Sequence, residues 1–232
     1  MSELLSIVVP VYNEEKTVGA VIEALLAIDL PIAREVLVVN DGSTDGTRAV
    51  LDRLPDQRDR LHIVHAAANG GKGTAIRIGF QQARGTIVAI QDADLELNPA
   101  QLASLVVPIL RGDTAVVYGS RFLRGTPSGA PWASVAANRF LTALTNVLYG
   151  SRLTDMETCY KVMRTDVARA LKLEANRFDI EPEITAQLLR AGHRIVELPV
   201  LFEPRSRAQG KKIGWRDGAS AIAVLLKQRV RR

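Results

Sequence analysis

The chain has 232 residues, of which 47% are hydrophobic and 24% are charged, and it contains one cysteine, Cys159. This length and composition are typical of a globular protein with a self-sufficient core, and they exclude a disordered or fibrous chain. A single cysteine excludes an internal disulfide framework and a cysteine-based metal site, and it favours a reducing compartment. We expect Cys159 to be a packing residue.

The charge balance favours anionic partners, because 30 Lys and Arg stand against 25 Asp and Glu, a net charge of +5. Aromatic residues make up only 5% of the chain, so we predict no nucleic-acid partner. The longest apolar stretches, 102–110 and 219–226, are too short to cross a bilayer, and the N-terminus lacks the features of an export signal. We expect a cytoplasmic protein, either free or peripheral on the cytoplasmic face of the membrane.

Apolar, β-branched runs alternate with stretches of helical periodicity in the first half of the chain. The runs that predict strands are 5–11, 35–39, 61–64, 86–90 and 115–118. Helices are predicted between them, over about 18–26 and 71–84. Because the strands are apolar almost throughout, they should be buried on both faces, and the fold class is α/β with a mostly parallel sheet flanked by helices.

The pattern changes after about residue 122. A loop rich in Gly, Pro and Ser covers 125–131, a long apolar helix is predicted over 133–149, and a charged, mixed segment follows. A late strand pattern at 194–202 leads into a basic loop, 203–217, and then a terminal helix. We predict one domain, 1–232, with two lobes, 1–121 and 122–232.

Acidic clusters follow three of the predicted strands: YNEE after the first, NDGSTD after the second and QDADLE after the fourth. Ligands of open α/β sheets bind beyond the carboxyl ends of the strands, so these clusters should meet at one edge. A divalent cation would relieve their mutual repulsion. In an extended chain Asp92 and Asp94 would share a face, and Glu96 continues the series. Solvated turns and helix caps are the alternative, most of all for Asp41 to Asp45.

A glycine-rich segment, 69–73, follows the third strand and precedes a helix. It fails the Walker pattern, because Gly73 follows Lys72 where Ser or Thr is required, and Ile76 breaks the dinucleotide fingerprint. We therefore interpret it as a flexible loop that lets the backbone at Gly71 approach a ligand, with Lys72 as its cation.

In this order, PVYNE, VVNDGSTDGT, NGGKGTA and DADLE resemble the inverting nucleotide-sugar glycosyltransferases of family 2. The later GSRF, DMETCYKVMR, RFDIEPEI and GKKIGWRDG resemble the branch that contains dolichol-phosphate mannosyltransferase and the bacterial polyprenyl-phosphate hexosyltransferases. The resemblance covers about residues 5–226. It implies a GT-A fold and metal-dependent transfer of a hexose from a nucleotide diphosphate sugar, GDP-mannose or UDP-glucose, to polyprenyl or dolichyl phosphate.

The resemblance also implies roles for single residues, with 1–121 as the nucleotide-sugar lobe and 122–232 as the acceptor lobe with a basic C-terminal helix. Together with the glycine-rich loop, the donor-binding set is Pro10, Tyr12, Glu14, Asp41, Gly71, Lys72, Asp92, Ala93, Asp94, Lys211 and Lys212. The ligands of a Mg²⁺ or Mn²⁺ ion would be Asp92, Asp94 and Glu96. Arg121 would meet the acceptor phosphate, with Arg139 as a second candidate.

The nature of the acceptor decides which residues must be catalytic. A lipid phosphate has a second pKa near ~6 and attacks as an anion without a strong base, whereas a sugar hydroxyl needs a carboxylate base, for which Asp155 is the candidate. The catalytic set is therefore Asp92, Asp94, Arg121 and Asp155, with both acceptors open. A catalytically idle nucleotide-binding or lipid-surface module is a third hypothesis.

The remaining charged and polar residues carry less specific expectations. The basic residues of 205–216 and 227–232 predict contact with an anionic membrane surface. His62, His65 and His193 share no ligand spacing and should be edge or surface residues. Glu183 should be structural, while Glu181 is either structural or part of the acceptor wall. The sequence predicts no oligomeric state.

Overall fold

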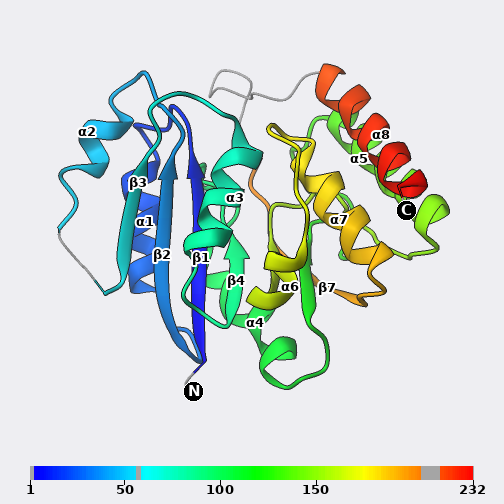
Figure 1. The fold of residues 1–232 in the computed structure, drawn as a ribbon, viewed down its shortest axis with the longest axis horizontal. Helices are drawn as coiled ribbons and strands as arrows, with labels where there is room; N and C mark the ends of the chain where they lie inside the picture. Colours follow the sequence, from blue (N-terminus) through cyan, green and yellow to red (C-terminus); the bar gives the residue numbers. More distant parts are fainter. Residues whose placement is uncertain (1–2, 56–58, 205–214, 232) are drawn as a thin grey trace.

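A computed structural model describes residues 3–55, 59–204 and 215–231 (Figure 1). Seven strands of this part of the chain form one sheet in the order β3-β2-β1-β4-β6-β5-β7. The strands are β1 Leu4–Val11, β2 Ala33–Asn40, β3 Leu61–His65, β4 Ile87–Ile90, β5 Val116–Ser120, β6 Lys161–Arg164 and β7 Ile195–Pro199.

Helices connect the strands and cover both faces of the sheet. Figure 1 shows α3 in front of the strands and α1 behind them. The helices are α1 Val18–Ala27, α2 Thr47–Leu51, α3 Lys72–Gln82, α4 Leu102–Leu110, α5 Trp132–Tyr149, α6 Thr165–Ala170, α7 Ile180–Arg190 and α8 Trp215–Val230, with a short 3₁₀ turn η1 at Pro99–Gln101.

The strands β1, β2 and β4 supply the centre of the main core. Their apolar residues are buried almost without exception, because helices cover both faces, and strands β1 to β4 all run parallel. The predicted α/β class with a mostly parallel sheet is confirmed.

One strand was not predicted. β6 lies between β4 and β5 and runs antiparallel to both, with Val162 opposite Ala89 and Val117. Its four residues, KVMR, begin and end with a charged residue and are too short to show the period of a strand. The strand nevertheless joins the two halves of the chain in a single sheet.

A second, smaller core lies between α5, α7 and α8. Leu141, Met156, Ala186, Ala221 and Leu225 form it.

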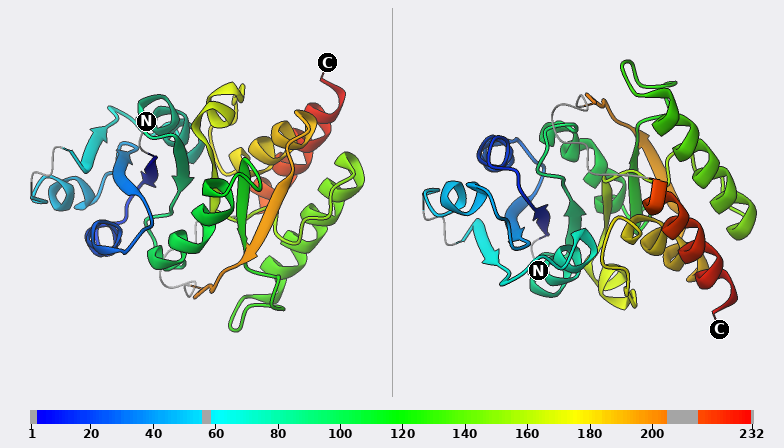
Figure 2. Two further views of the ribbon diagram at one scale, coloured as in Figure 1. Left: turned by 90° about the horizontal axis from the view of Figure 1, so that it is seen from below. Right: turned by 90° about the horizontal axis from the view of Figure 1, so that it is seen from above.

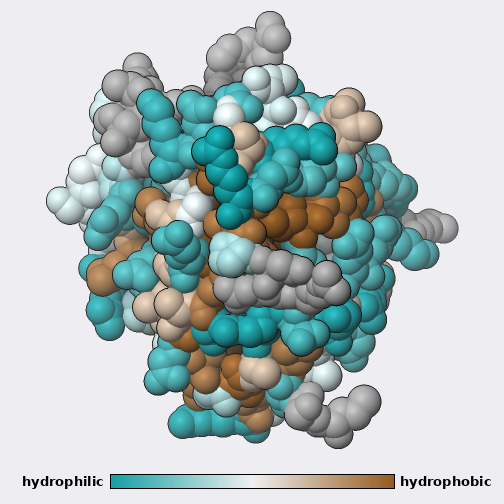
Figure 3. All heavy atoms as spheres, turned by 90° about the vertical axis from the view of Figure 1, so that its left-hand side faces the viewer, coloured by the Kyte–Doolittle hydropathy of each residue, from teal (hydrophilic) through white to brown (hydrophobic). Residues whose placement is uncertain are grey.

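Figure 2 shows α5 at the outer edge of the molecule in both of its views. The opposite end carries α2 and the edge strand β3, and Figure 3 shows there an apolar band among hydrophilic side chains. In the residues that the structure describes, no helix combines the length and the apolarity that crossing a bilayer requires.

Candidate active site

The carboxyl ends of β1, β2 and β4 meet at one edge of the sheet, as the sequence predicted. Pro10 lies within β1, with Tyr12 and Glu14 directly after the strand. The loops after β1 and β2 are tied together, because the Asn13 amide oxygen accepts a hydrogen bond from the Thr44 backbone at 2.8 Å and the Asn13 backbone donates to the Ser43 hydroxyl at 3.0 Å. The φ of Asn13 is 55°, a conformation that asparagine tolerates well. This edge is therefore a rigid platform of interlocked loops.

Asp41 is buried and holds the glycine-rich loop in place. Its Oδ1 accepts from the Gly70 backbone at 2.8 Å, and its Oδ2 accepts from the Gly71 backbone at 2.7 Å. The interpretation of this loop as flexible is wrong. A Cβ on Gly71, whose φ is 90°, would lie 2.3 Å from the Asn176 carbonyl oxygen, and one on Gly73 would lie 2.2 Å from that of Ala175. The glycines are required because another backbone segment packs against them.

Lys72, at the start of α3, is shared by two carboxylates. Its Nζ lies 2.8 Å from Asp92 Oδ1 and 2.9 Å from Glu181 Oε1. Burial alone would lower the pKa of Lys72, but the charges of Asp92 and Glu181 outweigh it and raise the pKa well above its usual value. Burial opposes ionisation of Asp92, yet Lys72 holds the pKa of that carboxyl below its usual value.

The charge series continues inward through Glu181, at the start of α7. Glu181 Oε2 lies 2.5 Å from the Nζ of the fully buried Lys161, which also donates to the Met156 carbonyl at 3.1 Å. We call Asp92, Lys72, Glu181 and Lys161 the charge ladder. Sequence reasoning left Glu181 open and missed Lys161, whose only signal was its place in the DMETCYKVMR segment.

The segment after β4 turns instead of extending. Residues 93–94 form a turn and Leu95 has a φ of 62°, so the expectation that Asp92, Asp94 and Glu96 share the face of an extended chain is wrong. Asp94 Oδ1 instead accepts from the Glu96 backbone at 3.1 Å. The turn is anchored by Tyr160, which directly precedes β6: its hydroxyl donates to Gln91 Oε1 at 2.6 Å and lies 2.9 Å from the Asn98 carbonyl oxygen. Ala93 is buried in this turn.

Within the described residues, no three His, Cys, Asp or Glu side chains gather closely enough to hold an ion by themselves. The donor chemistry still fits Mg²⁺ or Mn²⁺, since Asp94 and Glu96 offer carboxylate oxygens at the edge. The remaining ligands of such an ion would be phosphate oxygens and water.

Arg121, which directly follows β5, is fixed by a buried carboxylate. Its Nε lies 2.6 Å from Asp155 Oδ2 and its Nη2 lies 2.7 Å from Asp155 Oδ1, a bidentate pair. The Asn138 amide donates to Asp155 Oδ1 at 2.7 Å, and the Phe202 ring lies against the guanidinium, 5.2 Å from its centroid. Burial opposes the charge, but Asp155 raises the pKa of Arg121 above its already high value.

This geometry disfavours the alternative in which Asp155 is a general base. The side chain is fully buried, and both carboxylate oxygens accept hydrogen bonds from Arg121. Asn138 also donates to Oδ1, so the lone pairs that a general base would use already accept hydrogen bonds within the protein. Asp155 instead orients Arg121.

The other predicted site residues lie further out or outside the description. Arg139, on α5, is exposed and donates to the Thr126 hydroxyl at 2.8 Å. Lys211 and Lys212 lie outside the described residues. His62 and His65 belong to the edge strand β3, and Glu183 accepts from the backbones of Glu174 and Ala175, which is a structural role.

Two further groups lie beside the charge ladder: sequence reasoning missed Glu157, whereas the predicted packing role of Cys159 agrees with its burial. Burial raises the pKa of Glu157 to about 7, and its Oε1 is buried with no hydrogen-bond partner in the described part of the chain. Burial also raises the pKa of the Cys159 thiol well above its usual value, so this residue is an inert packing group beside Asp92. No local sequence pattern indicates the buried environment of Glu157.

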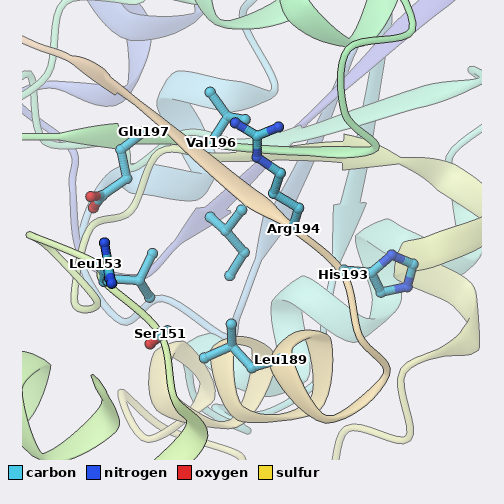
Figure 4. A pocket seen from close by; sticks show the side chains of 9 residues that line it. Ser151, Leu153, Leu189, His193, Arg194, Val196 and Glu197 are labelled. Carbon is cyan, nitrogen blue, oxygen red and sulfur yellow. The ribbon is translucent and has the colours of Figure 1, made fainter. Parts of the chain in front are cut away.

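A hollow in the surface lies away from this edge. Ser151, Leu153, Leu189 and His193 to Glu197 line it together with Arg152, around the start of β7 (Figure 4). Because β7 runs parallel to β5, residues 193–196 lie at the amino end of the sheet, opposite to Arg121. The hollow is therefore separate from the candidate site.

Known proteins resemble this chain over most of its length. A glycosyltransferase named AglD from Haloferax volcanii is 30% identical over 87% of this chain, which covers only 33% of that relative. An undecaprenyl-phosphate mannosyltransferase from Micrococcus luteus is 29% identical over 94% of this chain, which covers 90% of that relative.

A solved structure shares the fold. Glucosyl-3-phosphoglycerate synthase from Mycobacterium tuberculosis, crystallised with Mn²⁺, UDP and phosphoglyceric acid, superposes with a TM-score of 0.76 at 18% identity, over 99% of this chain and 79% of that one. The family model Glycosyl transferase family 2 matches residues 6–172. The sheet, the acidic edge and this match agree with the resemblance seen in the motifs, and the chain belongs to glycosyl transferase family 2.

Proposed function

We propose that the protein transfers a hexose from a nucleotide diphosphate sugar to a polyprenyl phosphate, with inversion at the anomeric carbon and with help from a divalent metal ion. The observation that carries the proposal is Arg121, a nearly buried cation that Asp155 orients at the same edge as Asp92 and Asp94. The Micrococcus relative, whose name specifies an undecaprenyl-phosphate acceptor, supports the same substrate class.

The donor would lie across the loops after β1, β2 and β4. In this proposal Pro10, Tyr12, Glu14 and Asp41 contact the base and ribose, and Asp94 holds the metal ion, with Asp92 and Glu96 beside it. Asp41 also fixes the loop that carries Lys72 through two backbone hydrogen bonds, so its loss would disturb both features. A bound Mg²⁺ or Mn²⁺ supplies positive charge to the leaving diphosphate.

The acceptor side needs a group that binds a phosphate and does not remove a proton from it. A guanidinium has five N–H donors, and the pair with Asp155 engages its Nε and Nη2 edge. The rest of the guanidinium can bind phosphate oxygens. This division of donors favours a phosphate acceptor over a hydroxyl, which would need the buried Asp155 as a base.

The transfer is a single displacement. An anionic oxygen of the acceptor phosphate attacks the anomeric carbon and forms the new C–O bond, while the bond to the donor diphosphate breaks and its electron pair leaves with the nucleoside diphosphate. Because the acceptor oxygen is already ionised, no proton has to move. Arg121 orients the attacking phosphate, and preorganisation of this kind is a large part of enzymatic rate enhancement.

Transfer of radiolabelled sugar from GDP-mannose and from UDP-glucose tests the proposal. The acceptors are a polyprenyl phosphate and the matching unphosphorylated polyprenol, each with Mn²⁺, Mg²⁺ or EDTA. We expect a β-linked product from an α-linked donor, with the phosphate acceptor only and with metal only. Transfer to the polyprenol, or a retained configuration, would overturn the proposal.

Two variants assign the roles. Arg121→Ala should reduce use of the phosphate acceptor by roughly 100-fold or more while leaving nucleotide affinity near that of the unchanged protein. Arg111→Ala is the matched control, because it removes the same charge from an exposed position before β5 to which no role is assigned. Asp94→Asn should abolish metal-dependent transfer and metal-dependent nucleotide binding, with an unchanged circular dichroism spectrum.

A further inference from the structure

The outward face of α5 is apolar where a surface helix is normally polar. Trp132, Phe140 and Val147 are 82%, 58% and 83% exposed, and Ala136 and Ala143 between them are exposed as well. The spacings of four, four, three and four residues place all five side chains on one side of the helix. We call these five residues the apolar stripe.

The inward face of the same helix carries polar side chains. Asn138 is buried and bonds Asp155, and the buried Thr142 hydroxyl donates to Asn138 and accepts from the Met156 backbone. Leu141 is buried on this side as well, and Leu144 packs against the same core, so α5 carries apolar side chains on its inward face and on its outward face. Within residues 3–55, 59–204 and 215–231, packing does not account for the stripe, because α7 and α8 contact other sides of α5 through residues such as Leu141.

The segment of sequence that contains the stripe carries charge of one sign. Between Asp113 and Asp155 the sequence contains no acidic residue, but it contains Arg121, Arg124, Arg139 and Arg152. Arg124, Arg139 and Arg152 are exposed, before, within and after α5 respectively. An apolar face flanked by cations, with a tryptophan at one end, matches the chemistry of an anionic bilayer surface.

The predicted membrane contact at the C-terminus carries a weaker signal. Lys227 lies 3.0 Å and Arg231 2.5 Å from carboxylate oxygens of Glu174, so a neighbouring acid already neutralises part of the charge of the tail. The basic loop 205–214 lies outside the described residues. The surface around α5 has positive charge without such acidic neighbours in the sequence.

We propose that the apolar stripe docks on an anionic lipid surface, with α5 lying parallel to it. The 18 residues of α5 span about 27 Å, and their inner face is buried in the protein, so the helix lies on the membrane and does not cross it. Asn138 of α5 contacts Asp155, which orients Arg121. Docking would thus fix the orientation of the acceptor-binding arginine relative to the membrane that carries a polyprenyl phosphate, a step that rests on the proposed function.

Vesicle flotation of the full chain tests the docking without donor or acceptor. The test variant is Trp132→Ser with Phe140→Ser and Val147→Ser, and the matched control is Leu226→Ser with Val230→Ser, two residues on α8 that are 48% and 79% exposed. We expect binding to phosphatidylcholine vesicles that contain phosphatidylglycerol, a loss of roughly 10-fold or more in the stripe variant and little change in the control. Quenching of Trp132 by brominated lipid should follow the binding.

Other outcomes overturn the docking proposal. Equal binding by the stripe variant and the unchanged protein would do so, and so would a dimer in sedimentation experiments that only the stripe variant abolishes, since a second copy would then be the occupant. Activity separates this proposal from the proposed function. The stripe variant should keep full transfer to a short, water-soluble prenyl phosphate and lose transfer to a vesicle-bound one. If the unchanged protein binds vesicles but transfers no sugar to either prenyl phosphate, the proposed function is overturned and the docking proposal is not.

Discussion

The two sides of the carboxyl edge hold buried charge in different ways. Around β4, Lys72 is shared by Asp92 and Glu181, while around β5, Arg121 and Asp155 form a one-to-one bidentate pair. The Asp92 side chain is 28% exposed, whereas that of Glu181 is only 4% exposed. Asp92 can therefore leave Lys72 and bind another group at the edge, while Glu181 still neutralises Lys72. The residues around β4 are therefore suited to accommodate a further charged group beside Lys72. The residues around β5 are suited to hold the Arg121 guanidinium in one orientation.

The largest effect should come from the inner end of the charge ladder. Lys161→Met leaves Glu181 with one cation in place of two at a fully buried position, and we expect a loss of about 3–5 kcal/mol in the free energy of unfolding. Urea denaturation measures it. Lys172→Met, at an exposed position, is the control and should change the free energy by less than about 0.5 kcal/mol. Similar losses in both variants would show that the ladder is not a special element.

Disrupting the Arg121–Asp155 pair should reduce the use of the phosphate acceptor. Asp155→Asn keeps the size of the side chain but removes the charge that orients Arg121, and we expect kcat/KM for the phosphate acceptor to fall about 100-fold, or about 2.7 kcal/mol. The nucleotide affinity measured by calorimetry should stay the same, because the Asp155 side chain bonds Arg121 and Asn138 and no described residue of the donor loops. Asp113→Asn, an exposed position, is the control. An equal loss of donor affinity would mean that the two sides are not independent.

Glu157, beside the charge ladder, should make the stability of the protein depend on pH. Its pKa of about 7 in the folded protein lies above the value of 4.5 for an unfolded chain, so the folded state holds the extra proton and stability falls as pH rises from about 4.5 through 7. Glu157→Gln removes this term. We expect the variant to gain about 1–2 kcal/mol relative to the unchanged protein on going from pH 5 to pH 8. Glu23→Gln, on the exposed face of α1, should show no such difference.

The smallest effect should come from the exposed ion pairs of the C-terminal helix. Glu174 bonds Lys227 and Arg231, which hold its pKa at about 2, but all three side chains are largely in water. Glu174→Gln should therefore leave the melting temperature at moderate salt unchanged within error. A clear drop in the melting temperature would show that this exposed cluster stabilises the protein as much as the buried ion pairs do.

The strands and the acidic edge could be predicted because their causes are local. The runs after which Asp41 and Asp92 occur are apolar enough to require burial, and parallel strands bring their carboxyl ends together. The family also follows from short motifs in a fixed order. These features depend on residues close to one another in the sequence.

The detailed geometry of the site could not be predicted because its partners are distant in the chain. Asp155 lies 34 positions from Arg121, and Tyr160 fixes a turn through contacts with residues 69 and 62 positions before it. The glycines of 70–73 indicate close packing, but only the fold shows that residues 175–177 supply the neighbour. A turn between Asp92 and Asp94 likewise depends on contacts from Tyr160, next to a strand that has no sequence pattern of its own.

The position of β6 has a consequence for synthesis of the chain. Because β6 separates β4 from β5, a nascent chain of residues 1–121 would contain strands β1 to β4 with an unpaired, fully apolar edge at β4, and β5 would have no neighbour. The sheet closes only after residue 164 has left the ribosome, and the central pairings then span 70 residues or more. Fragments that end near residue 121 should therefore aggregate. During synthesis, a chaperone would be needed most between the emergence of β4 and the emergence of β6 from the ribosome.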